Sequence, residues 1–266
     1  MKNGSYRFLR TEIDALTYES FESTLDQWLE DKDGPSHHVA CLNAYCVTLA
    51  LKNDRLARIY HRAHVRGADG VPFVKWIRMM TGWECDRFCA PDLINYLSAR
   101  SADKGYTFYL YGGDPEVAEA MQRDMETRFP HISIVGRYSP PFRPLTEEED
   151  RVICDEINRL KPDIVCVGLG TPKQDYWIDE HLESIRGSVL IASGATFDFF
   201  GGRVGYAPEV IRRSGFEWLY RLLGKDFKRL FYRYTVLNCV FLGNFALQVT
   251  RLRRFSPPGP ETGPTK

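Results

Sequence analysis

The feature that most limits how this chain can fold is a repeated alternation of strand-like and helix-like segments. Residues 106–111 (YTFYLY) are dominated by aromatic and apolar side chains, which favour a strand. The next four residues, GGDP, break that pattern, and Asp followed by Pro suits a helix start because Asp can cap it and Pro fits its first turn. Val117, Met121 and Met125 then recur at helical spacing. This segment therefore predicts a strand followed directly by a helix.

The same alternation extends over most of the first 200 residues. Thr146 and Glu149 stand three residues apart before an apolar run and resemble a capping box. Strands that alternate with helices of this length predict parallel βαβ units with right-handed crossovers. The predicted fold class is therefore α/β, with a Rossmann-like parallel sheet flanked by helices. The other expected elements are a strand and helix in 37–53, an extended piece, turn and helix in 65–80, strands at 132–135, 163–168 and 188–194, and helices over 146–162 and from about 173.

Composition narrows the class of protein. With 44% hydrophobic and 13% aromatic residues, the 266-residue chain can form a well-packed core in one large or two small domains. The 35 basic and 35 acidic residues give a net charge of zero, so we expect no nucleic acid as a partner. The N-terminus lacks the continuous apolar run of a signal peptide. The seven cysteines include no C-x-x-C pair, which favours reduced, buried thiols in a cytoplasmic protein.

The last third of the chain differs in character. We interpret residues 1–214 as the α/β domain, 215–254 as a helical, basic C-terminal appendage that associates with the membrane, and 255–266 as a disordered tail. The apolar run 234–249 is shorter than the ~20 residues of a membrane span and is interrupted by three amide side chains. Its basic flanks predict a peripheral helix on an anionic membrane surface. The alternative is a helix that packs on the core or on a second copy of the chain.

Two sets of residues carry this membrane hypothesis. The apolar face of the helix is expected to comprise Val236, Val240, Gly243 and Leu247. The flanking cations are Lys225, Lys228, Arg229 and Arg233 before the helix, and Arg251, Arg253 and Arg254 after it.

Sequence breaks at the strand ends indicate where a ligand binds. In open parallel sheets, ligands sit beyond the carboxyl ends of the strands. The breaks at Asn43, 112–113, 168–170 and Gly194 all follow expected strands. Glycines allow a ligand to approach the backbone, and the free N–H groups at helix starts favour phosphate. The pattern therefore predicts a nucleotide or another phosphorylated ligand.

Missing motifs argue against several nucleotide chemistries. The chain has no G-x-x-x-x-G-K-[ST] motif, and Gly168-Leu-Gly170 lacks the third glycine of a dinucleotide fingerprint. The D-x-D at residues 31–33 precedes the first convincing strand and is interpreted as a solvated turn. No His/Cys cluster has the spacing of a zinc site. A metal site is therefore disfavoured, and so is a dinucleotide dehydrogenase.

Seven segments together resemble a known family. They are LNAYCVTLA (42–50), ADGVPFV (68–74), CDRFCAPDL (85–93), YLYGGDPEVAEA (109–120), KPDIVCVGLGTPKQDYWI (161–178), GATFDFFGG (194–202) and GFEWLYRLL (215–223). In this order and combination they resemble the WecG/TagA/CpsF family of bacterial glycosyltransferases, and the likeness covers roughly residues 37 to 235.

The resemblance implies a fold and an activity. Family members have a Rossmann-like domain and a C-terminal appendage that engages the membrane and completes the active site. They transfer a sugar from a UDP-sugar to a polyprenyl-diphosphate-linked acceptor, with inversion and without a metal or other cofactor, in exopolysaccharide or cell-surface polysaccharide biosynthesis. For this chain, the resemblance implies a protein bound peripherally to the inner face of the cytoplasmic membrane.

The resemblance assigns three residues to catalysis. Asp69 matches the proposed base, and inversion by direct displacement needs a carboxylate to take the proton of the attacking hydroxyl. Asn43 matches a residue that holds the sugar or the acceptor, and Arg87 matches one that offsets charge on the departing UDP. Read without the family, Asp69-Gly70 fits a simple turn, Asn43 a helix cap and Arg87 a solvated surface residue.

The donor is expected at the other strand ends. Gly112, Gly168 and Gly170 would let it approach the backbone, and Lys173 and Gln174 would reach its sugar or phosphates from a helix start. Asp198 matches a residue near the uracil or ribose, and its alternative role is to cap a tight loop. The aromatic ring expected to stack on the base is Phe142 or Tyr138.

The chain departs from the family pattern in the appendage and at one strand. The expected appendage arginines are Arg221, Arg229 and Arg233, with Lys228 as an alternate. Tyr206 replaces an Arg that is common in the family, and Cys41 replaces a Thr. Two other functions stay open at this point. One is a non-catalytic, nucleotide-binding, membrane-associated scaffold of a polysaccharide assembly complex; the other is an α/β enzyme that uses NAD or S-adenosylmethionine.

Overall fold

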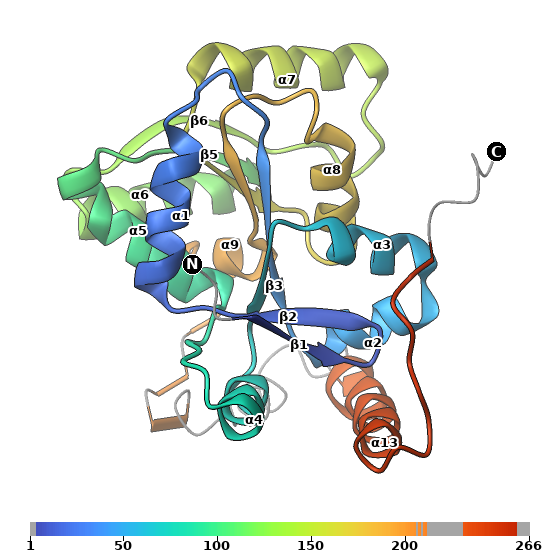
Figure 1. Cartoon of the computed structure of the whole chain (residues 1–266). Helices are drawn as coiled ribbons and strands as arrows, with labels where there is room; N and C mark the ends of the chain where they lie inside the picture. The colour runs from blue at the N-terminus through green and yellow to red at the C-terminus, as the bar shows by residue number, and fades with distance from the viewer. Residues whose placement is uncertain (1–3, 206, 209, 212–230, 260–266) are drawn as a thin grey trace.

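A six-stranded parallel sheet with helices on both faces forms the centre of the molecule (Figure 1). The computed structural model describes residues 4–205, 207–208, 210–211 and 231–259. The strand order is β4-β3-β8-β7-β5-β6, and every pairing in this sheet is parallel. The predicted α/β class with a Rossmann-like parallel sheet is therefore confirmed. The strands are β3 (His37–Leu42), β4 (Val65–Ala68), β5 (Thr107–Gly112), β6 (Ser133–Tyr138), β7 (Ile164–Gly168) and β8 (Val189–Ala192).

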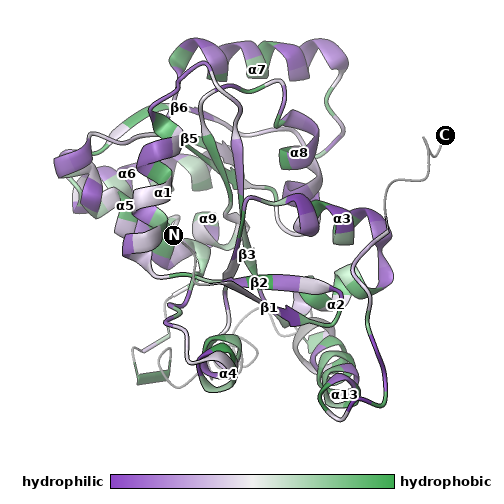
Figure 2. Cartoon of the chain, in the orientation of Figure 1, coloured by the Kyte–Doolittle hydropathy of each residue, from purple (hydrophilic) through white to green (hydrophobic). Residues whose placement is uncertain are grey.

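The helices cover the two faces of the sheet because successive strand side chains point to opposite sides. Phe108 and Leu110 of β5 join the core beneath one set of helices, and Tyr109 and Tyr111 join the core on the other face. The interior strands are mainly hydrophobic in Figure 2, whereas α7 is largely hydrophilic. One face is covered by α1 (Tyr18–Leu29), α5 (Ala90–Lys104), α6 (Pro115–Arg128) and α9 (Gly194–Phe200), and the other by α2 (Ala44–Lys52), α3 (Asp54–Arg62), α4 (Val71–Thr81), α7 (Glu147–Leu160) and α8 (Lys173–His181).

Several helices begin where local sequence motifs predicted, although one predicted capping contact is absent. The Thr146 hydroxyl accepts from the Glu149 N–H at 3.2 Å, and the Glu149 carboxylate accepts from the Thr146 N–H at 2.9 Å, so the capping box is confirmed. Asp114 occupies the cap position of α6 but makes no capping hydrogen bond. Its carboxylate instead pairs with Arg203, so side-chain capping by Asp114 was wrong. All seven cysteines are free thiols, and Cys239 is exposed.

An N-terminal hairpin was not anticipated from the sequence. β1 (Gly4–Phe8) and β2 (Thr11–Ala15) form an antiparallel pair apart from the main sheet. The buried Asp14 carboxylate accepts from the Arg66 guanidinium at 2.8 Å and from the Arg66 backbone N–H at 2.9 Å. This ion pair ties β2 to β4 and compensates both charges in the interior.

The C-terminal helix packs on the α/β domain. A π-helical turn (Tyr232–Val236) leads into α13 (Leu237–Val249), which contacts α2. Phe241 of α13 is buried against Phe73 of α4, with ring centroids 5.4 Å apart. One face of α13 therefore packs on the core, as the alternative to a membrane role predicted. No helix in the described residues is long and apolar enough to cross a bilayer.

The opposite face of α13 carries the residues that the sequence predicted as the apolar, membrane-facing side of this helix. Gly243 and Leu247 of α13 are exposed, and so is Val236 at the end of the π-helical turn, while Val240 is half-buried. The expected boundary between residues 214 and 215 falls outside the described residues, so the division into domain, appendage and tail stays a prediction. Phe255, at the start of the expected tail, packs against the core cluster that also contains Phe241.

Candidate functional site

Asn43 and Asp69 meet at the carboxyl ends of two adjacent parallel strands. Asn43 follows β3 and caps α2, where its side-chain oxygen accepts from the N–H groups of Tyr45 at 3.1 Å and Cys46 at 3.3 Å. These two bonds turn its amide nitrogen outwards, and that nitrogen donates to the Asp69 carboxylate at 2.8 Å. Asp69 follows β4, and its N–H donates to the Leu42 carbonyl at 2.9 Å. Asn43 is therefore both a helix cap and the hydrogen-bond donor that orients Asp69.

Arg87 lies beside the same strand end. The following residue, Phe88, donates its backbone N–H to the Ala68 carbonyl at 2.8 Å, one residue before Asp69. The Arg87 carbonyl accepts from the Tyr18 hydroxyl at 2.7 Å. The loop fits closely here because Gly67 leaves room for Phe88, whose Cβ would lie 2.4 Å from a Cβ at position 67. Half-buried Arg87 is therefore held at the edge that carries Asp69.

The charges of Arg87 and Asp69 both affect the pKa of the same neighbouring thiol, Cys89. Burial raises the pKa of the Cys89 thiol, Arg87 opposes that rise, and Asp69 adds to it. Burial followed by the Asp69 charge likewise raises the pKa of Cys41. Cys41 therefore stays a neutral thiol next to the carboxylate and does not offer a thiolate nucleophile.

The glycines at the ends of β5 and β7 are needed by the fold itself. A Cβ on Gly112 would lie 2.6–2.7 Å from backbone atoms of Gly168, and a Cβ on Gly168 would lie 2.3 Å from the Phe197 ring. Phe197, from α9, also fills the space above Gly113. The two strand ends can thus approach each other and receive the aromatic ring only without side chains. Gly170 differs, because a Cβ there would meet nothing within 4 Å.

Gln174 joins the turns that follow β7 and β8. Its side chain is 6% exposed, and its oxygen accepts from the N–H groups of Gly170 and Gly194, both at 3.0 Å. Its nitrogen donates to the Thr171 hydroxyl at 3.3 Å. Sequence reasoning directed Gln174 at the donor, whereas in this structure its amide is directed at two backbone turns. It therefore shapes the strand-end surface between Gly170 and Gly194.

We expect Gln174→Met to lower the free energy of unfolding by about 2 kcal/mol. Methionine keeps nearly the same volume but leaves the partly buried N–H groups of Gly170 and Gly194 without an acceptor, at about 1–3 kcal/mol for each group when fully buried and less here. Urea denaturation checks this value. Lys173→Met, at the neighbouring exposed position, is the matched control and should change stability by less than about 0.5 kcal/mol. Equal stability of the two variants would contradict the bracing role of Gln174.

The other expected donor residues are spread along the same edge. Lys173 begins α8 and is exposed, and Asp198 is half-buried in α9. Tyr138, at the end of β6, stacks at 6.0 Å on Tyr111. Phe142 is 97% exposed in the loop that follows. Of the two rings expected to stack on a base, Tyr138 is therefore already part of an aromatic stack, and Phe142 stands in solvent.

Asp175 is a buried carboxyl that sequence reasoning missed. It follows Gln174 in the first turn of α8 and is almost fully buried. Burial raises its pKa to about 7, and hydrogen bonds to the carboxyl offset only part of that rise. In the sequence, the only sign of its importance was its position directly after Pro172-Lys173-Gln174. Its burial becomes visible only in the tertiary packing.

One group in the described residues has the donor types of a metal site. Asp150, Cys154 and His181 offer ligand atoms within 4.8 Å of one another. The His181 ring bonds the Asp150 carboxylate at 2.9 Å through Nε2 and the Trp177 carbonyl at 2.6 Å through Nδ1. Burial disfavours its charge, but hydrogen bonds to Cys154, Asp150 and Trp177 outweigh this and raise the pKa of His181 to about 9. A charged imidazolium paired with Asp150 explains the cluster without a metal.

The site therefore consists of two groups along one edge. Asn43, Asp69 and Arg87 lie beyond β3 and β4, and the glycine turns lie beyond β7 and β5. Gly194, just after β8, lies between the two groups. Three strand spacings of about 4.8 Å separate β3 from β5, or about 14 Å in all. This edge can hold an elongated ligand with a carboxylate base at one end. Arg221, Arg229 and Tyr206 lie outside the described residues, as does Lys228, and the Arg233 side chain is not described either.

Comparison with known families gives a match over almost the whole chain. The model of the "Glycosyl transferase WecG/TagA/CpsF family" matches residues 6–255. The matched range includes every strand of the sheet, both groups of site residues and α13.

Proposed function

Because the chain belongs to the WecG/TagA/CpsF family of glycosyltransferases, we propose that it transfers a sugar from a UDP-sugar to a polyprenyl-diphosphate-linked acceptor. The reaction inverts the anomeric carbon, needs no metal and serves exopolysaccharide or cell-surface polysaccharide biosynthesis. Family membership by itself implies a nucleotide-sugar donor and a glycan acceptor. The Asn43–Asp69 pair is the observation that carries the finer proposal, because it presents an oriented carboxylate at the ligand-binding edge.

Asp69 acts as the general base in this proposal. The acceptor hydroxyl gives its proton to the carboxylate while its oxygen forms the new bond to the anomeric carbon. The bond from that carbon to the diphosphate breaks, and UDP leaves with the electron pair. Asn43 positions Asp69 through its amide N–H, since its own oxygen is held by Tyr45 and Cys46.

The remaining residues serve the donor. UDP lies along the ends of β7, β5 and β8, where Gly170 leaves open space and Lys173 supplies a cation. Asp198 accepts from the uracil or ribose, and Tyr138 or Phe142 stacks on the base. Arg87, together with Arg221, Arg229 and Arg233 of the appendage, offsets the charge on the departing diphosphate.

A UDP-release assay tests the proposal. The protein is incubated with a panel of UDP-sugars and a lipid-linked acceptor extract, and we expect one donor to release UDP only when the acceptor is present. NAD and S-adenosylmethionine serve as competitors that should leave release unchanged. Binding of UDP without release under any combination would favour a non-catalytic scaffold of a polysaccharide assembly complex instead.

The polyprenyl acceptor resides in a bilayer, so we also propose that the protein binds the inner face of the cytoplasmic membrane peripherally. Exposed apolar side chains support this at one end of the molecule, where α4 and α13 lie opposite α7 (Figure 1). They include Met79 and Met80 of α4, Leu242 and Val249 of α13, and Leu252 just beyond it. Arginines 251, 253 and 254 are also exposed there, which suits anionic lipid.

We expect the double variant Leu242→Asn, Leu252→Asn to bind anionic vesicles at least roughly tenfold more weakly. Leu242 is 61% exposed and Leu252 77% exposed, so their loss removes apolar contact with lipid without opening the core. Sedimentation with phosphatidylglycerol-containing vesicles measures the change. Val152→Asn is the control, because Val152 is 53% exposed on α7 at the far end. If both proteins sediment equally, α13 is not the membrane contact.

A further inference from the structure

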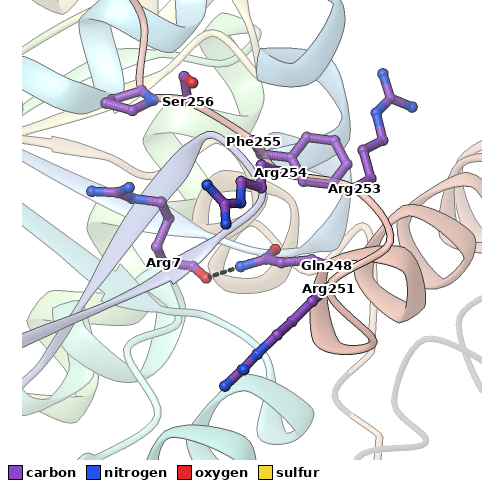
Figure 3. A pocket seen from close by; sticks show the side chains of 8 residues that line it. Arg7, Gln248, Arg251, Arg253, Arg254, Phe255 and Ser256 are labelled. Atoms are coloured by element: carbon purple, nitrogen blue, oxygen red, sulfur yellow. Dashed lines mark hydrogen bonds between the residues drawn. The ribbon is translucent and has the colours of Figure 1, made fainter.

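A basic hollow lies where the two ends of the chain meet. The C-terminal strap, residues 251–257, runs beside the β1–β2 hairpin and the end of α13 (Figure 1). It lines a hollow of about 580 Å³ together with Arg7 and Gln248. In Figure 3, Arg254 occupies the centre with Arg7 to one side, while Arg251 starts beside Gln248 and extends away from both of them. Four of the eight lining residues are arginines and none is acidic, so the hollow is strongly cationic.

Hydrogen bonds fix the walls of this hollow. The Gln248 side chain accepts from the Leu9 N–H at 2.7 Å and donates to the Arg7 carbonyl at 2.8 Å, which joins α13 to the hairpin. The strap folds back because Arg251 has a left-handed backbone, with φ of 61°, and the Arg253 N–H donates to the Leu247 carbonyl at 3.0 Å. The wall is therefore built from two sequence-distant segments held in register.

One of the four arginines is a structural brace. The Arg253 guanidinium donates to the Asn244 side chain at 3.1 Å and lies 4.9 Å from the centre of the Phe255 ring. In Figure 3 it is turned outwards, away from Arg254. Arg253 therefore holds the strap in place, which leaves Arg7 and Arg254 to meet a ligand and Arg251 as a further cation at the edge of the hollow.

These three arginines carry more positive charge than their surroundings neutralise. Within the described part of the chain, the Arg251 and Arg254 side chains make no ion pair or hydrogen bond. Arg7 pairs with Glu12 at 3.1 Å, but Glu12 also faces Arg66 at 3.3 Å. Guanidinium groups present planar forks of donors that match phosphate oxygens. A multiply charged phosphate relieves the repulsion among them.

We propose that the hollow is a binding site for a phosphate or diphosphate group carried by a membrane lipid, held by Arg7 and Arg254, with Arg251 adding positive charge at its edge. The exposed Leu252 side chain on the strap places apolar surface next to the charged site, which suits a ligand with a phosphate head and an apolar chain. The lipid carrier rests on the proposed function, whereas binding of the phosphate itself does not. The site is separate from the strand-end site, because its lining comes from β1, the end of α13 and the strap.

Calorimetric titration with inorganic diphosphate tests the site, and substitutions of its arginines distinguish it from the strand-end site. We expect Arg251→Gln, Arg254→Gln to weaken binding by roughly tenfold or more, since each charge-assisted bond is worth about a factor of ten or above. The control removes two charges elsewhere, with Arg123→Gln on α6 and Arg151→Gln on α7. Both variants should keep the wild-type melting temperature. Equal weakening in the two variants would show diffuse electrostatics and overturn the site.

Vesicles distinguish the lipid from a soluble ligand. At equal surface charge, we expect the wild-type protein to bind phosphatidate vesicles several-fold better than phosphatidylglycerol vesicles, since phosphatidate exposes a terminal phosphate. The Arg251→Gln, Arg254→Gln variant should lose that preference. Diphosphate binding without any vesicle preference would overturn the lipid carrier. Absence of UDP release with diphosphate binding intact would overturn sugar transfer and leave this site standing.

Discussion

Asp69→Asn should lower sugar transfer by a factor on the order of 10²–10⁴ while leaving the affinity for UDP unchanged. The amide keeps the size and shape of the carboxylate, and its oxygen can still accept from the Asn43 amide, which now donates at 2.8 Å. Only the ability to take a proton from the acceptor hydroxyl is lost. The measurement is the single-turnover rate of UDP release with acceptor, alongside UDP binding by calorimetry.

Asp92→Asn is the matched control for that experiment. Asp92 lies in the first turn of α5, and both Asp92 and Asp69 act on the pKa of Cys89. The same chemical change is thus made in the same neighbourhood, without touching the Asn43–Asp69 pair. We expect the Asp92 variant to transfer sugar within about threefold of the wild-type rate. An Asp69 variant that matched it would remove Asp69 as the base.

Gly112→Ala should lower the free energy of unfolding by more than about 3 kcal/mol. Gly112 has φ of 132°, and its added Cβ would lie 2.6 Å from the Gly168 carbonyl carbon. A backbone atom cannot rotate aside as a side chain can, so β5 and β7 would have to separate at the point where Phe197 covers them. Urea denaturation measures the loss.

Gly170→Ala separates backbone conformation from crowding. Gly170 also has a left-handed backbone, with φ of 77°, but an added Cβ would meet nothing within 4 Å. We expect a cost of about 1–2 kcal/mol from the backbone conformation alone. If Gly112→Ala proved no more costly than Gly170→Ala, the contact between the ends of β5 and β7 would not be what requires glycine there.

Much of the fold could be predicted because its signals are local. The aromatic run before GGDP and the capping box at Thr146 each mark an element boundary within a few residues of sequence. The N-terminal hairpin lacked such a signal, since its two strands are five residues each. Its attachment depends on Asp14 and Arg66, which are 52 residues apart in the chain. Neither residue looks unusual until the fold makes them an ion pair.

The sequence predicted which residues belong to the candidate site better than it predicted which of them contact each other. Parallel strands place Asn43 and Asp69 at one edge, but their direct contact requires β3 and β4 to be neighbours, which the sequence does not state. The glycines at the strand ends were interpreted as room for a ligand. The close packing of Gly112 and Gly168 against each other and Phe197 already explains why these two positions need glycine. Gln174 illustrates the same point, because a polar residue at a helix start can face a ligand or the backbone equally well.

The position of β8 has a consequence for how the molecule is made. β8 is the last strand of the sheet in sequence, yet it lies between β3 and β7. During synthesis, the part that carries Asn43 and Asp69 and the part that carries the glycine turns both emerge before residues 189–192 do. Until then each part has an open strand edge that can pair with another chain. A four-residue strand, Val189–Ala192, then fills the gap and sets the register of one part against the other. A nascent chain halted before residue 189 would therefore hold most of the residues of the site without their mutual alignment.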